Sequence, residues 1–243
     1  MHKKVFNSIL IIAALVAAMS FSPAGNPKLT IRFENYVGDK KLKLDSVLYE
    51  NATGQPYTVS MFKYYVGNFN LRKLGGGDVV SQGYFLINEE DKKSLEINLN
   101  NIPRDTFSYL IFTLGVDSTD NCSGAQSGAL DPVNGMFWAW NSGYVFLKME
   151  GISAASNSTG KRLEFHIGGY REPNNCIKII HLPLKNFVVD ENNVITVKAD
   201  LNHLFFGSNP VDFSKLSSVT DFHNAKSIAD NYASMFLVMD AGK

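Results

Sequence analysis

The sequence predicts a single-domain antiparallel β-sandwich with long loops and a short C-terminal helix. Short segments in which apolar and polar residues alternate recur along the chain, as half-buried strands require. Turn-forming residues separate these segments, and few helical periods lie between them. The sequence has 243 residues, enough to bury the core of one large β domain. No internal repeat or low-complexity tract divides it.

The first 25 residues have the order of a secretory signal peptide. Lys3 and Lys4 give a positive start, an apolar run covers Ile9 to Met19, and small residues follow. This run is shorter than the ~20 residues of a membrane span, so cleavage between Ser22 and Gly25 is favoured over an uncleaved anchor. No cysteine follows that could carry a lipid. We therefore expect an exported domain of residues 26–243, periplasmic or secreted, without stable membrane insertion.

The charge balance excludes one class of partner. The full chain has 23 basic and 23 acidic residues. Removing residues 1–25 takes away Lys3 and Lys4 and no acid, which leaves 21 basic and 23 acidic residues. A near-neutral chain without a basic stripe has no electrostatic footprint for nucleic acid.

The expected elements follow in chain order. A turn at Val37–Lys40 joins the first two strands, and Tyr57–Leu71 is one long β-prone segment. Residues from Ala225 to Phe236 place apolar side chains at helical spacing, which predicts the C-terminal helix. The remaining predicted strands are Leu29–Phe33, Leu42–Asp45, Leu95–Leu99, Phe107–Leu114, Tyr144–Met149, Arg162–Ile167, Ile177–Leu184 and Val194–Ala199.

Two cysteines, Cys122 and Cys176, lie in polar, turn-forming surroundings. In an oxidising compartment a single Cys122–Cys176 disulfide is the leading hypothesis, and two free thiols are the alternative. The bridge would close a long loop and contribute roughly 4 kcal/mol in the chain-entropy model.

The middle of the chain is its most unusual part. Glycines and an Asp-Pro pair predict a long loop before a strand that contains both tryptophans, Trp138 and Trp140. Their spacing places both indoles on one face of a strand. Core packing is the ordinary interpretation of such a pair.

The histidines give a weak metal signal. His166 alternates with apolar neighbours, His181 lies inside an apolar run, and His203 and His223 lie near predicted loops. No pair has metal-ligand spacing, although imidazoles that converge in space would suit copper or zinc. A second possibility is a calcium site of oxygen ligands, but turn stabilisation explains its residues better: Asp117, Asp120, Asn121 and Asp131.

No arrangement of an activated nucleophile or of paired catalytic carboxylates is evident, so we expect a protein that is not an enzyme.

Several motifs, in order, resemble those of the MbnP-like family of copper-associated periplasmic proteins, more distantly related to CorA and MopE. The most specific is the tryptophan-bearing segment Gly135–Tyr144. The others are Lys63–Asn68, Leu114–Asp117, Gly128–Pro132, Lys148–Gly151, Phe165–Gly169 and Ile228–Tyr232.

This resemblance implies copper as the cofactor and oxidation of a tryptophan to kynurenine by a MauG-like dihaem partner. Carried over, Trp138 is the first candidate for modification and Trp140 the second. His166 is the first ligand candidate, and His181 the second ligand that we assign. MopE-type sites place a histidine two residues after the modified tryptophan, where this chain has Trp140.

The leading hypothesis is therefore copper binding or copper handling. The alternative is an extracytoplasmic module, without metal, that binds a carbohydrate or a protein. Trp138, Trp140 and Tyr144 would then be exposed and would stack on the ligand. Burial of these rings would argue against stacking.

Overall fold

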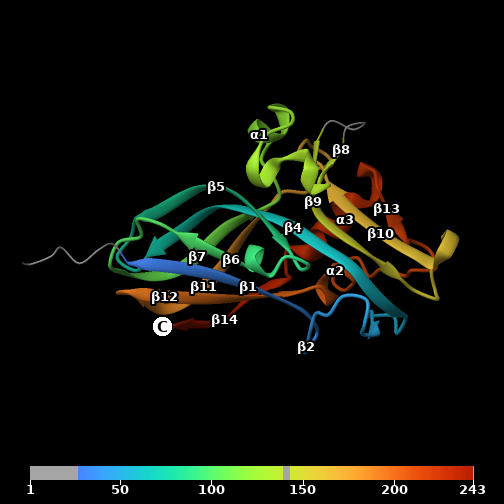
Figure 1. The fold of residues 1–243 in the computed structure, drawn as a ribbon, viewed down its shortest axis with the longest axis horizontal. Coiled ribbons are helices and arrows are strands. Elements are labelled where there is room, and N and C mark those ends of the chain that lie inside the picture. The colour runs from blue at the N-terminus through green and yellow to red at the C-terminus, as the bar shows by residue number, and fades with distance from the viewer. Residues whose placement is uncertain (1–26, 139–142, 243) are drawn as a thin grey trace, which may run out of the picture.

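The computed structural model describes residues 27–138 and 143–242, and its two β-sheets pack against each other (Figure 1). The expected signal peptide and Trp140 lie outside the described residues. The smaller sheet has the order β14 (Phe236–Gly242), β12 (Asn192–Asp200), β1 (Lys28–Val37), β2 (Lys40–Lys41), and β6 (Glu96–Leu99) also pairs with β1.

The larger sheet has the order β11 (Lys178–Val189), β7 (Asp105–Leu114), β4 (Pro56–Lys73), β9 (Gly143–Ile152), β10 (Arg162–Gly168), β13 (Ser218–Val219). Strands β3 (Tyr49–Glu50) and β5 (Asp78–Asn88) also pair with β4, and β8 (Phe137–Trp138) pairs with β9. The helices are α1 (Ser118–Cys122), α2 (Asn202–Phe205) and α3 (Phe222–Tyr232), with 3₁₀ turns η1 (Lys92–Leu95), η2 (Gly128–Leu130), η3 (Pro132–Asn134) and η4 (Thr159–Lys161).

The all-β sandwich with a short C-terminal helix is confirmed, with one refinement. The sheets are mixed, because β1 runs parallel to β12 and β10 runs parallel to β13. Parallel neighbours need a long connection, and here most of the chain lies between β1 and β12. Among the described residues, no helix is long and apolar enough to cross a membrane.

Most predicted strands are present, and two local expectations were wrong. Leu42–Asp45 alternates in sequence, but Leu42 and Lys43 are irregular and a turn begins at Leu44, with φ = 58° at Asp45. The apolar pattern toward Phe236 continues past the helix, yet α3 ends at Tyr232 and Phe236 begins β14.

Strand β4 organises the larger sheet. Its first half pairs with β9 and its second half with β7, while β5 pairs along the opposite edge. Strands β7 and β9 therefore follow one another along β4, and the sheet divides into two halves where β7 ends. At this division Gly115 has φ = 106°, and a Cβ there would lie 2.8 Å from the Phe146 ring. The chain leaves the sheet here for the loops around α1 and β8, which lie together at one edge of the molecule (Figure 1).

Aromatic side chains fill the core in two groups. Between the sheets, Phe33 of β1 makes edge-on contacts with Tyr64 and Phe112 of the larger sheet. Under the β9–β10 half, Phe165 packs edge-on against Phe205 of α2, with ring centroids 5.0 Å apart. Helix α3 contacts β10 and buries the apolar side chains that predicted it. The β9–β10 half is thus covered by α2 and α3.

Candidate functional site

The indole of Trp138 lies buried beside β10. β8 pairs with the start of β9, with Trp138 opposite Gly143, and the Trp138 side chain is only 5% exposed. A Cβ placed on Gly168 would lie 2.8 Å from Cζ3 of Trp138 and 2.5 Å from the carbonyl oxygen of Tyr144. The six-membered ring of the indole therefore occupies the space that a side chain at position 168 would need.

His166 lies two residues before Gly168 on β10. The register of β10 with β9 shifts between Ile167 and Gly168, so the regular alternation of faces is interrupted between the two positions. The structure thus places the first ligand candidate two residues along β10 from the position on which the first modification candidate packs.

The imidazole of His166 is mostly buried and has one acidic partner. Its Nε2 lies 2.8 Å from Oε1 of Glu150, and Lys148 is the residue opposite it on β9. Burial lowers the pKa of His166, the positive charge of Lys148 lowers it further, and the bond to Glu150 opposes both. The ring is therefore neutral at pH 7, which is the form that binds metals.

His181 does not share this site. It is exposed on β11. His166 pairs with Lys148 of β9, which pairs with Lys63 of β4. His181 pairs with Ile111 of β7, which pairs with Asn70 of β4. Seven residues of extended strand separate these two positions on β4 by roughly 23 Å. The structure does not bring His166 and His181 together, and local spacing could not show this because it does not reveal which part of β4 each strand faces.

His203 is also elsewhere. It belongs to α2, and its Nδ1 lies 3.1 Å from the hydroxyl of Ser234. Phe205 of the same helix packs on Phe165, which points to the opposite face of β10 from His166. The side chain of His223 lies outside the described residues.

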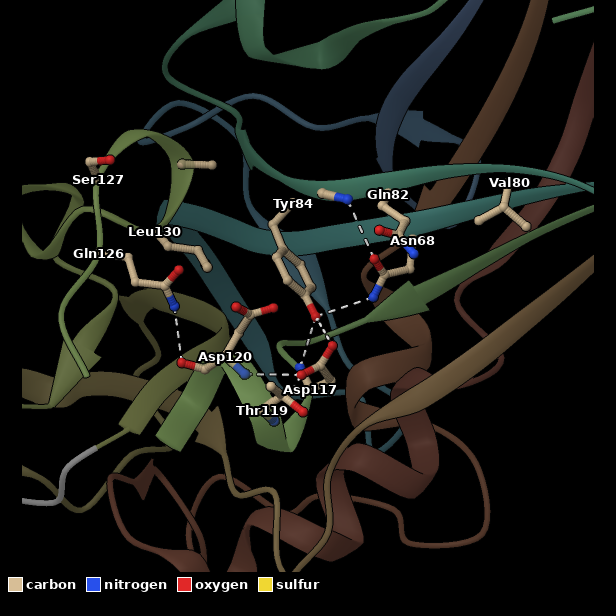
Figure 2. Close-up of a pocket in the computed structure, with 12 residues that line it drawn as sticks. Asn68, Val80, Gln82, Tyr84, Asp117, Thr119, Asp120, Gln126, Ser127 and Leu130 are labelled. Atoms are coloured by element: carbon tan, nitrogen blue, oxygen red, sulfur yellow. Dashed lines mark hydrogen bonds between the residues drawn. The ribbon is translucent and has the colours of Figure 1, made fainter. Parts of the chain in front are cut away.

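A second feature of this loop region is an open, polar cavity of about 560 Å³. Figure 2 shows Tyr84 at its centre, with Asp117 and Asn68 bonded to the Tyr84 hydroxyl. The hydroxyl donates to Oδ2 of Asp117 at 2.6 Å and accepts from Nδ2 of Asn68 at 3.2 Å and from the Asp117 backbone N–H at 3.1 Å.

The other oxygen of Asp117 begins helix α1. Oδ1 accepts from the backbone N–H groups of Thr119 and Asp120 at 2.9 and 3.0 Å. Burial opposes ionisation of Asp117, but the bonds from Tyr84 and from these N–H groups outweigh it and lower its pKa. Burial, together with donation to this carboxylate, raises the pKa of Tyr84. Asp117 is therefore ionised and Tyr84 protonated at neutral pH.

Comparisons with known proteins agree with this architecture. The model of the MbnP family matches residues 26–224. The chain belongs to the MbnP family. Its fold is similar to the solved structure of MbnP from Methylosinus trichosporium, with a TM-score of 0.51 and 14% identity over 76% of this chain and 82% of that one. No protein with a curated description matches the sequence.

Glycines in the motifs of this MbnP-family chain make room for aromatic rings. A Cβ on Gly67 would lie 2.6 Å from the ring of Tyr84, Gly115 adjoins Phe146, and Gly168 adjoins Trp138. The sequence did not signal Tyr84, Asn68 or Gln82 as cavity residues. A usable hint was present, because a glycine inside a strand marks a close approach, and β4 and β5 each contain one.

The described residues do not by themselves complete a copper site. On β9 and β10 they supply one imidazole, His166, bonded to one carboxylate, Glu150. In the described ranges no group of three or more metal-binding side chains converges. Three of the four residues considered as calcium ligands have structural roles. Asp117 caps α1, Asp131 caps η3 through the N–H of Val133, and Asn121 bonds backbone groups of Val116 and Tyr144.

The expected disulfide is not formed in this structure. Cys122 is an exposed free thiol at the end of α1, 3.7 Å from the hydroxyl of Tyr170, and Cys176 is a buried free thiol. The backbone of Cys176 is held by Gly169 and by the hydroxyl of Tyr232. Burial raises the pKa of Cys176 to about 12.

The aromatic platform that sugar stacking would need is largely missing. Trp138 is 5% exposed and Tyr144 is 1% exposed. Trp140 lies outside the described residues.

Proposed function

We propose that this MbnP-family chain is exported and takes part in copper handling, and that it is not itself an enzyme. The observation that supports the proposal most is that His166 and the packing position of Trp138 lie on the same strand, β10. A mostly buried, neutral imidazole is a suitable copper ligand, and here it lies two residues along β10 from Gly168, on which the indole of Trp138 packs.

His166 would contribute one ligand, oriented by Glu150. The bond from Nε2 to Glu150 fixes the position of the ring and leaves Nδ1 as its other nitrogen. Because the described residues offer one imidazole here, we propose a role for His166 in copper handling and derive no coordination geometry from it.

Trp138 is the proposed site of oxidation to kynurenine. Its six-membered ring packs on Gly168, so the pyrrole ring, which that oxidation opens, lies on the side of the indole away from β10. A MauG-like dihaem partner would supply the oxidant.

The test combines copper binding with peptide mass mapping. The secreted protein, prepared with and without exposure to a dihaem partner of the MauG class, is titrated with copper. His166→Ala is compared with His181→Ala, a matched removal of an exposed imidazole. We expect His166→Ala alone to weaken binding by tenfold or more, and oxidised Trp138 only after exposure to the partner. Equal binding by both variants would contradict a role for His166, and unmodified Trp138 after exposure would contradict the oxidation step.

A further inference from the structure

The cavity around Tyr84 joins segments that are distant in sequence. Asn68 comes from β4, Gln82 and Tyr84 come from β5, and Asp120 belongs to α1. Ala129 and Leu130 of η2 add an apolar wall. In small-molecule sites, a few convergent polar groups in a concave surface fix the orientation of the ligand.

Two of the polar side chains that line the cavity make no hydrogen bond to the rest of the described chain. Neither carboxylate oxygen of Asp120 has a hydrogen-bond partner among the described residues, and the same holds for the side-chain amide of Gln82. Figure 2 shows these two groups on opposite sides of Tyr84, with Gln126 on the side of Asp120 and Asn68 on the side of Gln82.

The charges of the lining exclude several ligand classes. Asp117 and Asp120 are its charged groups, and no lysine or arginine lines it, so phosphates and carboxylates would be repelled. A calcium ion needs six or more oxygen ligands. Both oxygens of Asp117 are already committed to Tyr84 and α1, which leaves one free carboxylate.

A neutral ligand with many hydroxyl groups fits what remains. Adjacent hydroxyls can donate to the Asp120 carboxylate and exchange hydrogen bonds with the amides of Gln82 and Asn68. The apolar wall at Ala129 and Leu130 can contact a C–H face of such a ligand. We propose that this cavity is a carbohydrate site for a neutral mono- or disaccharide. The site is separate from Trp138 and His166 and does not depend on copper.

The test uses the mature protein and titration calorimetry with glucose, galactose, mannose and their disaccharides. Glucuronate and spermidine serve as the anionic and cationic probes. Asp120→Asn and Gln82→Ala are the site variants. Because neither side chain bonds to the rest of the described chain, both variants should keep the wild-type melting temperature. Asp39→Asn, at the exposed turn after β1, is the matched control.

We expect one neutral sugar to bind with a millimolar or lower dissociation constant. Asp120→Asn should weaken it roughly tenfold, because hydrogen bonds to a carboxylate are the strong ones, and Asp39→Asn should leave it unchanged. Tighter binding of glucuronate or spermidine than of every neutral sugar would overturn the proposal. Absence of binding by all the neutral sugars would also overturn it, as would equal binding by wild type and Asp120→Asn.

Discussion

Replacing Gly168 by alanine tests the packing that holds Trp138 beside β10. The new Cβ would lie 2.5 Å from the backbone carbonyl oxygen of Tyr144 and 2.8 Å from Cζ3 of Trp138. Both distances are far below ordinary contact, and the carbonyl belongs to a paired strand that cannot swing aside. Overpacking of this kind costs about 1–3 kcal/mol of unfolding free energy. We expect the upper half of that range.

The matched control is Gly75→Ala in the loop between β4 and β5. A Cβ there meets nothing within 4 Å, and the backbone is not left-handed. Alanine should therefore be neutral, or stabilising by up to about 1 kcal/mol through the unfolded chain.

Urea unfolding followed by tryptophan fluorescence measures both consequences at once. Gly168→Ala should lower the unfolding midpoint and shift native emission to longer wavelength, as Trp138 moves toward solvent. Gly75→Ala should do neither. If Gly168→Ala kept the stability and the emission of the wild type, the placement of the Trp138 indole against β10 would be wrong.

Three further predictions follow from buried polar groups and thiols. A thiol reagent should titrate Cys122 in the folded protein and Cys176 only after unfolding. The reason is that Cys122 is exposed, whereas Cys176 is buried and has a raised pKa. If the unfolded, unreduced protein had no reactive thiol, the disulfide would be established instead. Asn35→Ala should lower the unfolding free energy by roughly 2–4 kcal/mol, measured by urea unfolding, because it removes the 2.8 Å hydrogen bond to buried Glu89. A loss below about 1 kcal/mol would contradict a stabilising role for this hydrogen bond. Burial lowers the pKa of His166 in the folded state, so its protonation favours the unfolded chain, where the pKa is near 6.5. The stability of the folded state is therefore unaffected by titration of this residue well above pH 6.5. Unfolding free energy should therefore fall as the pH drops below 6.5, and His166→Gln should flatten that fall; an unchanged slope would exclude His166 as its source.

Local pattern was sufficient to predict the strands that have one buried face. The segment Leu29–Phe33 alternates because its odd positions enter the core, and the structure confirms this as β1. Strand β5 escaped prediction, because most of its residues are half-buried or exposed and no clean alternation results. The parallel pairing of β1 with β12 joins segments more than 150 residues apart, which no local pattern encodes.

The candidate site shows the same division between local and long-range information. The sequence identified Trp138 and His166 as separate candidates. Their common association with β10 depends on the packing of Trp138 against Gly168, which is a long-range contact. The separation of His181 from His166 has the same origin, because the position of each histidine along β4 is set by strand register. The cavity was missed because Tyr84 in a β-rich segment looks like an ordinary core residue.

The central proposal is that His166, two residues along β10 from the packing position of Trp138, is the histidine through which this MbnP-family chain binds copper. The most direct measurement follows the imidazole resonances of the mature protein by NMR as Cu²⁺ is added in substoichiometric steps. We predict that the His166 signals broaden first, together with the indole N–H of Trp138, while those of His181 and His203 persist. Earlier broadening of His181 or His203, or uniform broadening of all histidines, would contradict the account.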